Sequence, residues 1–370
     1  MPQLRNTQTN DIVTVDDQIA TWLLSRGSWE LYSGAVTPPS FDVAKINRIV
    51  ARDEDIESWG ASTANSDNIT FIQNAQNAAA AGGHQLHIPS SKGFYRISDT
   101  LYLDDKVVCY GDGRDDGGLR ATTTFPTDGR PLIRLGRAGS GTLMFGTRVK
   151  EMRLHGESRA HTIVYSTTAN EQSGVFNCHI AGYTHTGIHF LNGSCISVED
   201  LELSGSIAGV LYGIHFEECA NDNLVKRVTW GPGAAQHAVG LRCWHSQTVG
   251  IALHPEQCVV GIDFDDSSGI LFGVSGPNTN PTVTTLIRTQ NAQECAVFSA
   301  NKGVATNTIV DVVSGETITT DVKAWFAGGL RIKAGARPTV TGSKGANAAL
   351  TSLMTALGPS GLGLVTDSTT

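Results

Sequence analysis

Four short segments decide the fold, because a glycine followed by alternating apolar residues returns at intervals of 21 to 27 residues. They are GIHF at 187–190, GIHF at 213–216, GLRC at 240–243 and GIDF at 261–264. A weaker member, TIVY, occupies 162–165. A repeat of this length is typical of architectures in which each unit packs only against its neighbours.

A second set of apolar segments lies between the members of the first. Its members are VKEMRL from 149, VFNCHI from 175, VEDLEL from 198, VKRVTW from 225 and VGIALH from 249. Two β-type segments in each repeat indicate one coil of a parallel solenoid, since a propeller blade needs about 40 residues and helical repeats have a period of about 3.6. We therefore predict an all-β fold, a right-handed single-stranded parallel β-helix.

Side-chain alternation within these segments predicts which residues face the core. Successive side chains of a strand point to opposite sides, and one coil alone cannot bury its apolar side, so stacked coils must share one core. The predicted inward residues are Met152, Leu154, Cys178, Ile180, Leu201, Leu203, Val228 and Trp230 in one set, and Ile188, Phe190, Ile214, Phe216, Leu241, Cys243, Ile262 and Phe264 in the other.

Upstream of the repeats, residues 67–113 predict one helix followed by short strands. Asp67 or Asn68 is the expected helix N-cap, and Gly82-Gly83 end the helix. The apolar stripe of this helix consists of Ile69, Ile72, Ala75 and Ala79. The strands follow as LHIP at 86–89, GFYRIS at 93–98, LYL at 101–103 and VVCYGDG at 107–113. A helix at this point would cover the open end of the solenoid core.

The order of these features resembles the opening of the pectate-lyase-like β-helix superfamily. Its elements here are Gly60-Ala61, Asp67, the Ala-rich run 78–83, Ile88-Pro89 and Gly93-Phe94-Tyr95. Phage tailspikes and depolymerases share this opening, so the resemblance implies a β-helix and a protein of phage or polysaccharide-degrading type. The sequence lacks the Asp clusters for Ca²⁺ and the catalytic Arg of the lyases, so the resemblance implies a fold more than an activity.

Composition excludes several classes of protein. Hydrophobic residues make up 40% of the 370 residues, and the chain also contains 41 glycine residues. Charged residues make up only 17%, and this composition excludes intrinsic disorder. The formal net charge of −8 argues against nucleic acid as the main partner, and no apolar run is long enough to span a membrane. The seven Cys are irregularly spaced without a CxxC motif, so we expect buried thiols rather than disulfides.

We expect four segments along the chain. Residues 1–58 form an attachment or capping segment, with a helix at 16–27; residues 59–275 form the β-helix with its N-terminal helix. Residues 276–345 form the distal coils or a small β cap. Residues 346–370 form a short oligomerisation tail with a helix at 350–357, whose apolar stripe comprises Leu350, Leu353, Met354 and Leu357. The tail either folds back on the last coil or associates with two other copies, and it resembles the closing segments of phage head-fibre and tail-fibre proteins.

Outward residues of stacked coils form columns with a spacing of about 4.8 Å. One predicted column, together with the neighbouring Trp244, supplies the substrate-binding candidates, because aromatic rings and polar side chains both suit sugars. These candidates are His189, His215, Arg242, Asp263 and Trp244. A second predicted column contains Arg153, His179, Glu202 and Thr229.

The catalytic candidates are Glu218, Asp266 and His245. Inverting glycoside hydrolysis needs two carboxyl groups roughly 6.5–9.5 Å apart, and two coils correspond to about 9.6 Å. Glu218 and Asp266 occupy equivalent places two coils apart, with His245 between them. The alternative is that such outward charges only keep a solenoid soluble. Because the outward His recur at the period of about 26 residues and not as a compact set of ligands, we expect no metal and no cofactor.

These observations predict a bacteriophage or phage-derived virion spike or fibre that binds a host cell-surface polysaccharide. The expected state is a homotrimer, with other virion proteins as partners, assembled in the host cytoplasm because no signal peptide begins the chain. The negative charge favours neutral or cationic glycans, or binding by stacking and hydrogen bonds and not by ion pairs. The alternative function is a polysaccharide depolymerase, either a glycoside hydrolase or a lyase, on the same scaffold. A free bacterial enzyme is the third hypothesis.

Overall fold

The computed structural model describes residues 53–327, with gaps at 138–142, 206–209, 232–235, 279–282 and 293, and a few short terminal strands. The chain divides into two compact units, Met1–Glu54 and Asp55–Thr370. In the first unit, β1 (Gln3–Asn6) lies between β2 (Ile12–Thr14) and β3 (Trp29–Leu31) in an antiparallel sheet. The helix predicted at 16–27 lies outside the described residues.

The described residues of the second unit form mainly β-strands, most of them in two long sheets. Sheet 1 has ten strands, parallel except for the last pair. They are β7 (Leu101–Leu103), β10 (Pro131–Leu135), β14 (Thr162–Ser166), β18 (Thr186–Leu191), β20 (Tyr212–Glu217), β22 (His237–Trp244), β24 (Cys258–Asp265), β26 (Thr285–Gln290), β28 (Asn307–Asp311) and β29 (Thr317–Ile318).

Sheet 2 has fifteen strands; the pairings from β5 to β27 are parallel, and β27 pairs with β30 in the antiparallel sense. They are β4 (Asp53–Asp55), β5 (Gln85–His87), β6 (Phe94–Ile97), β8 (Val108–Tyr110), β9 (Gly118–Ala121), β12 (Arg148–Lys150), β13 (Arg153–His155), β16 (Gly174–Phe176), β17 (His179–Ala181), β19 (Ser197–Ser204), β21 (Asn223–Trp230), β23 (Gln247–Pro255), β25 (Ser268–Ser275), β27 (Glu294–Asn301) and β30 (Val322–Phe326).

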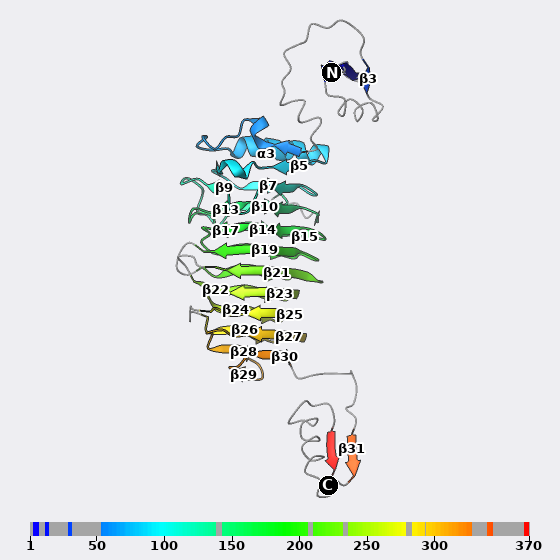
Figure 1. The fold of residues 1–370 in the computed structure, drawn as a ribbon, viewed down its shortest axis with the longest axis vertical. Coiled ribbons are helices and arrows are strands. Elements are labelled where there is room, and N and C mark those ends of the chain that lie inside the picture. Colours follow the sequence, from blue (N-terminus) through cyan, green and yellow to red (C-terminus); the bar gives the residue numbers. More distant parts are fainter. Residues whose placement is uncertain are drawn as a thin grey trace. The chain divides into compact units, whose positions relative to one another are not determined.

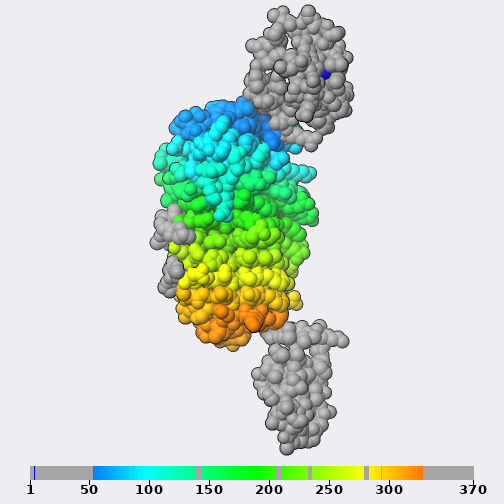
Figure 2. Space-filling view, in the orientation of Figure 1, coloured from blue at the N-terminus to red at the C-terminus, as the bar shows by residue number. Residues whose placement is uncertain are grey.

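From β18 to β28, consecutive strands alternate between the two sheets, so each repeat contributes one strand to each (Figure 1). Successive repeats follow one another as bands of colour along the unit (Figure 2). A small parallel pair, β11 (Met144–Phe145) and β15 (Ala169–Asn170), lies outside both sheets. Near the C-terminus, β31 (Thr339–Gly342) pairs with β32 (Thr366–Thr369); the predicted helix at 350–357 lies outside the described residues.

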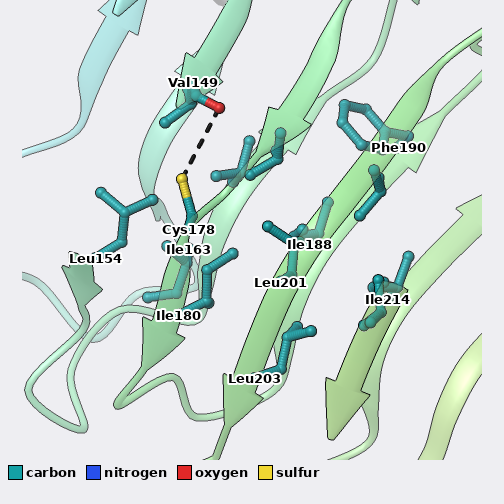
Figure 3. Close-up of a cluster of buried hydrophobic side chains, with 14 of the residues drawn as sticks. Val149, Leu154, Ile163, Cys178, Ile180, Ile188, Phe190, Leu201, Leu203 and Ile214 are labelled. Atoms are coloured by element: carbon teal, nitrogen blue, oxygen red, sulfur yellow. Dashed lines mark hydrogen bonds between the residues drawn. The ribbon is translucent and has the colours of Figure 1, made fainter. Parts of the chain in front are cut away.

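The core is continuous between the two sheets, and its register is the one predicted from alternation. Every predicted inward residue is at most 1% exposed, and all of them belong to a single buried cluster. Figure 3 shows the centre of this cluster, where the thiol of Cys178 lies 3.9 Å from the carbonyl oxygen of Val149. Full burial of one such aliphatic side chain contributes roughly 1.5–3 kcal/mol. Six of the seven free cysteines are buried, and Cys195 is partly exposed.

The helix α3 (Ile69–Gly82) lies at the end of the stack next to β5 (Figure 1). It begins where the sequence predicted: Asp67 accepts a hydrogen bond of 3.1 Å from the backbone N–H of Ile69. It ends at Gly83, whose φ of 66° is a left-handed conformation that favours glycine. Two short 3-10 helices, η1 (Ile56–Trp59) and η2 (Ser90–Lys92), flank α3 in sequence. The buried Ile72, Ala75 and Ala79 join the core.

After each central strand of sheet 1 the chain turns through one residue with positive φ. We call this column the sheet 1 corner; it comprises Asn192, Glu218, His245, Asp266 and Asn291, with φ between 47° and 54°. Backbone hydrogen bonds stack these turns, as from the N–H of Glu218 to the carbonyl of Trp244. Asn and Asp tolerate this conformation better than most other residues. The residue types at the sheet 1 corner are therefore partly explained by the positive φ of these positions, which strand alternation alone does not predict.

Candidate functional site

The outward side of sheet 1 carries a continuous column of polar and aromatic residues, which we call the central column. Each member lies directly opposite the next in the parallel register. In strand order they are Tyr102, Arg134, Tyr165, His189, His215, Arg242, Asp263 and Arg288. The four predicted binding residues His189, His215, Arg242 and Asp263 thus lie in one row, one coil apart. A neighbouring column runs from Glu217 through Trp244 to Asp265.

Stacked rings occupy the middle of the central column. The imidazoles of His189 and His215 lie 4.6 Å apart between centroids with an interplanar angle of 15°. The edge of Tyr165 faces His189 at 5.3 Å, and the guanidinium of Arg134 lies 5.3 Å from the centre of the Tyr165 ring. Parallel register places these rings above one another, because every coil contributes its side chain at the same height. This part of the face is suited to contacts with flat, partly apolar molecules.

Burial lowers the pKa of both central imidazoles. Burial, followed by the charges of His189 and Arg242, lowers the pKa of His215 to about 3. Burial also lowers the pKa of His189, although its hydrogen bond with Glu217 acts in the opposite direction. Glu217 links the two rings: its Oε2 lies 2.8 Å from Nε2 of His189 and 3.9 Å from Nδ1 of His215. Neutral imidazoles can donate and accept hydrogen bonds, and they can also ligate metals.

The next three residues of the central column, Arg242, Asp263 and Arg288, form an ion-pair network around a buried carboxylate. Asp263 is 0% exposed although it points away from the core, because Arg242 and Arg288 lie over it from the coils on either side. Arg242 also contacts Asp265 at 2.5 Å. Asp263 therefore differs from the exposed binding residue that its outward position predicted. Its role in the structure is to hold two guanidinium groups in place.

The three predicted catalytic residues lie together at the sheet 1 corner. Glu218 and His245 are exposed, and the structure stacks Glu218, His245 and Asp266 in consecutive coils. Nε2 of His245 lies 2.7 Å from Oδ2 of Asp266, and these two side chains are 43% and 41% exposed. Trp244, the predicted stacking residue, is partly exposed, and its ring stacks on His245 at 4.4 Å. The corner thus presents two carboxyl groups, an imidazole and an indole to solvent.

A cavity of about 540 Å³ opens on sheet 1 at the N-terminal end of the central column. The residues that matter chemically in its lining are Tyr102, Arg130, Arg134, His161, Tyr165 and His189. Arg130 is engaged by Asp99 and Asp128. Nε of Arg134, in contrast, is buried and finds no hydrogen-bond partner among the described residues. Guanidinium groups in the lining donate hydrogen bonds, so this cavity suits a ligand that supplies an acceptor oxygen.

Sequence reasoning missed most of this cavity. Tyr165 ends the weak repeat TIVY and is the register equivalent of His189, so the repeat already contained the signal for it. Arg134 lies in PLIRL at 131–135. This segment lacks the glycine of the four main segments, so the repeat pattern does not predict its place in sheet 1. Glu217 follows the buried Phe216 and therefore points outward by alternation, but its proximity to two imidazoles depends on side-chain rotamers.

The second predicted column lies on sheet 2. Arg153, His179, Glu202 and Thr229 follow one another in parallel register, as expected from alternation. Arg114 contacts Glu202 at 3.8 Å, and Asp115 lies 3.9 Å from His179. This column is thus paired with charges from the loop 111–117.

None of the described helices is long and apolar enough to cross a membrane.

No protein-family model matches the chain, and a sequence comparison with curated proteins finds no match. Among solved structures, the chain is similar to ORF18 of Geobacillus virus E2, with a TM-score of 0.44, 13% identity, and coverage of 77% of this chain and 67% of that chain. It is similar to the tailspike of Acinetobacter phage vb_AbaP_AS12, with a TM-score of 0.44, 11% identity, and coverage of 78% and 68%.

A further similar structure is the enzymatically active domain of tailspike protein 2 of bacteriophage CBA120. The TM-score is 0.46 at 13% identity, and the match covers 70% of this chain and 45% of that chain. The chain thus spans less than half of the length of this tailspike domain. Phage tailspikes are among the structures that the chain resembles, as the sequence predicted.

Proposed function

We propose that the chain is a phage or phage-derived virion spike or fibre whose sheet 1 binds a host cell-surface polysaccharide. In this proposal the coils form a right-handed single-stranded parallel β-helix, α3 caps its end, and residues 1–58 attach it to other virion proteins. The observation that carries the binding role is the cavity of about 540 Å³ with the unpartnered Nε of Arg134 in its lining.

The chemistry of the face supports a sugar polymer as the ligand. Sugar rings offer apolar C–H faces to aromatic rings such as Tyr165, and their hydroxyl and carboxylate oxygens accept hydrogen bonds from guanidinium groups such as Arg134. The central column repeats its side chains at a spacing of about 4.8 Å. A rigid face of this kind suits a repeating polymer, because successive sugars can meet successive coils.

The test measures binding of purified capsule or O-antigen polysaccharide to the full chain by titration calorimetry. Arg134→Gln and Tyr165→Ala should each weaken binding at least about tenfold, because an unmet hydrogen bond or a lost ring contact costs more than 1.4 kcal/mol. Arg153→Gln is the matched control: its Nε is also buried without a partner among the described residues, but it lies on sheet 2. Loss of binding only in the Arg153 variant would place the ligand on the other face.

A depolymerase is the second candidate function, supported by the sheet 1 corner. The hydrogen-bonded pair His245 and Asp266 lies next to Glu218 on a solvent-exposed edge. Two carboxyl groups and an imidazole provide the proton donors and acceptors that glycoside hydrolysis needs. Release of reducing sugars from the bound polysaccharide distinguishes this activity from binding alone.

Self-association is supported by an apolar patch on sheet 2. Phe272 and Ile270 on β25 are 43% and 40% exposed, and the ring of Phe272 stacks on Phe298 at 5.1 Å. Phe326 continues this row with an edge contact to Phe298. Exposed apolar patches of adjacent aromatic residues commonly mark interfaces. We propose a homotrimer in which this patch, the tail 346–370, or both meet other copies.

A further inference from the structure

We propose that His189, His215 and Glu217 bind one divalent transition-metal ion on the outward side of sheet 1. Each offers one ligand atom, and these three atoms lie within 4.8 Å of one another. No other group of three or more His, Cys, Asp or Glu side chains within the described parts of the chain meets this condition. All eleven His and all seven Cys lie in those parts.

The backbone places the three ligands by stacking and not by local sequence spacing. His189 on β18 lies directly opposite His215 on β20 in the parallel register. Glu217 follows His215 by two residues, so alternation puts both side chains on the same side of the sheet. The two histidines are 26 residues apart in sequence. A site formed between coils in this way does not need a short local His motif.

The strands that carry the ligands are held on both sides. β20 pairs with β18 and with β22, and the buried Phe190 and Phe216 stack beneath the site at 5.9 Å. The three ligand side chains are between 12% and 26% exposed. Only side-chain rotation is needed to adjust the ligands, since the backbone positions are already in place. Such preorganisation favours binding because little order has to be imposed.

The contacts among the ligands show how an ion fits. Oε2 of Glu217 already lies 2.8 Å from Nε2 of His189 and 3.9 Å from Nδ1 of His215. Ligand atoms around a tetrahedral ion with bonds of about 2.0–2.1 Å lie roughly 3.3 Å apart. The His189–Glu217 hydrogen bond must open slightly and the two rings must approach the carboxylate. An ion would then take the place of the hydrogen bond between His189 and Glu217, with the proton of the neutral His189 ring on Nδ1.

The donor set selects the class of ion. Two imidazole nitrogens and one carboxylate oxygen suit Zn²⁺, Co²⁺ and related ions, whereas Ca²⁺ and Mg²⁺ prefer oxygen ligands alone. Three protein ligands leave at least one coordination position for water or a ligand oxygen. His189 also lines the cavity described above. A sugar hydroxyl or carboxylate in that cavity is the chemical group that would complete the coordination.

Nearby positive charge does not prevent binding, because it is already compensated. Arg242 follows His215 in the central column, and its guanidinium contacts both Asp263 and Asp265. Glu217 adds a further negative charge within the site. The stacked pair His161 and His185, 4.2 Å apart, belongs to no group of three ligands within the described ranges and is therefore not a second site.

The experiment titrates the full chain with CoCl₂ and records visible ligand-field absorption, followed by displacement with ZnCl₂. We expect one Co²⁺ per chain. Loss of outer-shell partners already weakens metal binding roughly 10–100-fold, so removal of a direct ligand in His189→Asn or His215→Asn should weaken it at least about 100-fold. Circular dichroism and thermal melting confirm that each variant is folded. Glu217→Gln should weaken binding in the same direction.

His254→Asn is the matched control. Its Nε2 lies 2.8 Å from Glu256, the same distance as in the His189–Glu217 pair, but no second imidazole joins that pair to form a site. This variant and Cys195→Ser should bind Co²⁺ as the wild type does. Absence of Co²⁺ binding below millimolar concentration, or unchanged binding in both His189→Asn and His215→Asn, overturns the proposal. Neither result depends on whether the chain binds a polysaccharide.

Discussion

Arg288 binds Asp263 through two parallel hydrogen bonds, from Nε to Oδ1 at 2.7 Å and from NH2 to Oδ2 at 2.8 Å. The two residues lie on adjacent strands, β26 and β24, and directly opposite each other. The carboxylate is fully buried, while Arg288 remains 32% exposed. Arg242 contacts the same carboxylate from the other side. One buried charge thus connects three successive coils.

Removal of this charge should destabilise the fold. Asp263→Asn leaves Arg242 and Arg288 without their shared partner, and breaking a buried pair costs about 3–5 kcal/mol. The control is Asp200→Asn, which breaks an exposed pair with Arg227 and should cost less than about 1 kcal/mol. Urea unfolding monitored by circular dichroism measures both. Equal, small changes in the two variants would show that the buried pair contributes nothing special.

The register of the core predicts a strong effect at Ile214, which is 0% exposed. Ile214→Asp buries an unpaired charge between two coils and should prevent soluble expression, an effect of several kcal/mol. Ile214→Val removes one methylene and should cost about 0.5–1.5 kcal/mol. Val313→Asp serves as the control, because Val313 is 66% exposed and should change stability by less than about 0.5 kcal/mol. Normal yield of Ile214→Asp would contradict the observed register.

The assembly prediction compares two parts of the chain. Deleting residues 346–370 should convert a trimer to a monomer in light scattering and leave the β-type circular dichroism intact, since the tail stripe is too small to form a core alone. Phe272→Arg places a charge in the sheet 2 patch and is the alternative disruption. A deletion variant that stays trimeric, together with a monomeric Phe272→Arg, would assign the interface to sheet 2 and reject the tail.

The catalytic prediction concerns the sheet 1 corner. If the wild type cleaves a host glycan, Glu218→Asn and Asp266→Asn should each reduce sugar release about 10²–10⁴-fold, because each removes a proton-transfer group. Asn suits the positive φ of both positions, so assembly and binding should persist. Glu202→Gln on sheet 2 is the control. Retained cleavage in both corner variants rejects the pair, and no cleavage by the wild type on any host glycan favours a purely binding spike.

Acid should destabilise the protein through His237. Burial lowers the pKa of His237 from 6.5 to about 4, while the side chain hydrogen-bonds the buried Tyr183. The unfolded chain therefore takes up this proton at higher pH than the folded chain, so stability is complete above pH 6.5 and falls as the pH decreases toward 4. The loss attributable to this group is about 3 kcal/mol.

The measurement for His237 is urea unfolding of the wild type and of His237→Gln at pH 7 and pH 4.5. The quantity compared is the change in unfolding free energy between the two pH values. That change should be smaller in the variant, because glutamine does not titrate. Identical changes in the two proteins would mean that His237 titrates alike in the folded and unfolded states.

The repeat pattern predicted the core because the hydrophobicity of each residue and its place in the alternation can both be read from the sequence. Ile188, Ile214 and Leu241 recur at the same place in each repeat, so their stacking follows from the period alone. Conformation at the corner could not be predicted in this way. A positive φ is a backbone property, and Glu218 and His245 carry no sequence signal for it.

The chemistry of the site depends on contacts between coils, which a single repeat does not contain. Asp263 has the pattern of an exposed residue, and only the arginines one coil before and one coil after it bury it. The approach of Glu217 to His189 likewise depends on the rotamers of side chains on two strands. Sequence periodicity predicts which residues become neighbours. The packing of their side chains determines which of them are buried and which form ion pairs or hydrogen bonds.

Because the strands of sheet 1 are stacked, the length of its outward side can change only by whole repeats. β20 pairs with β18 and β22, and one period separates the equivalent glycines Gly213 and Gly240. In-frame loss or duplication of such a period would shorten or lengthen the face by about 4.8 Å, while each remaining strand still meets a neighbour of the same pattern. Recombination of whole repeats can therefore change the length of this surface without redesigning either end of the stack.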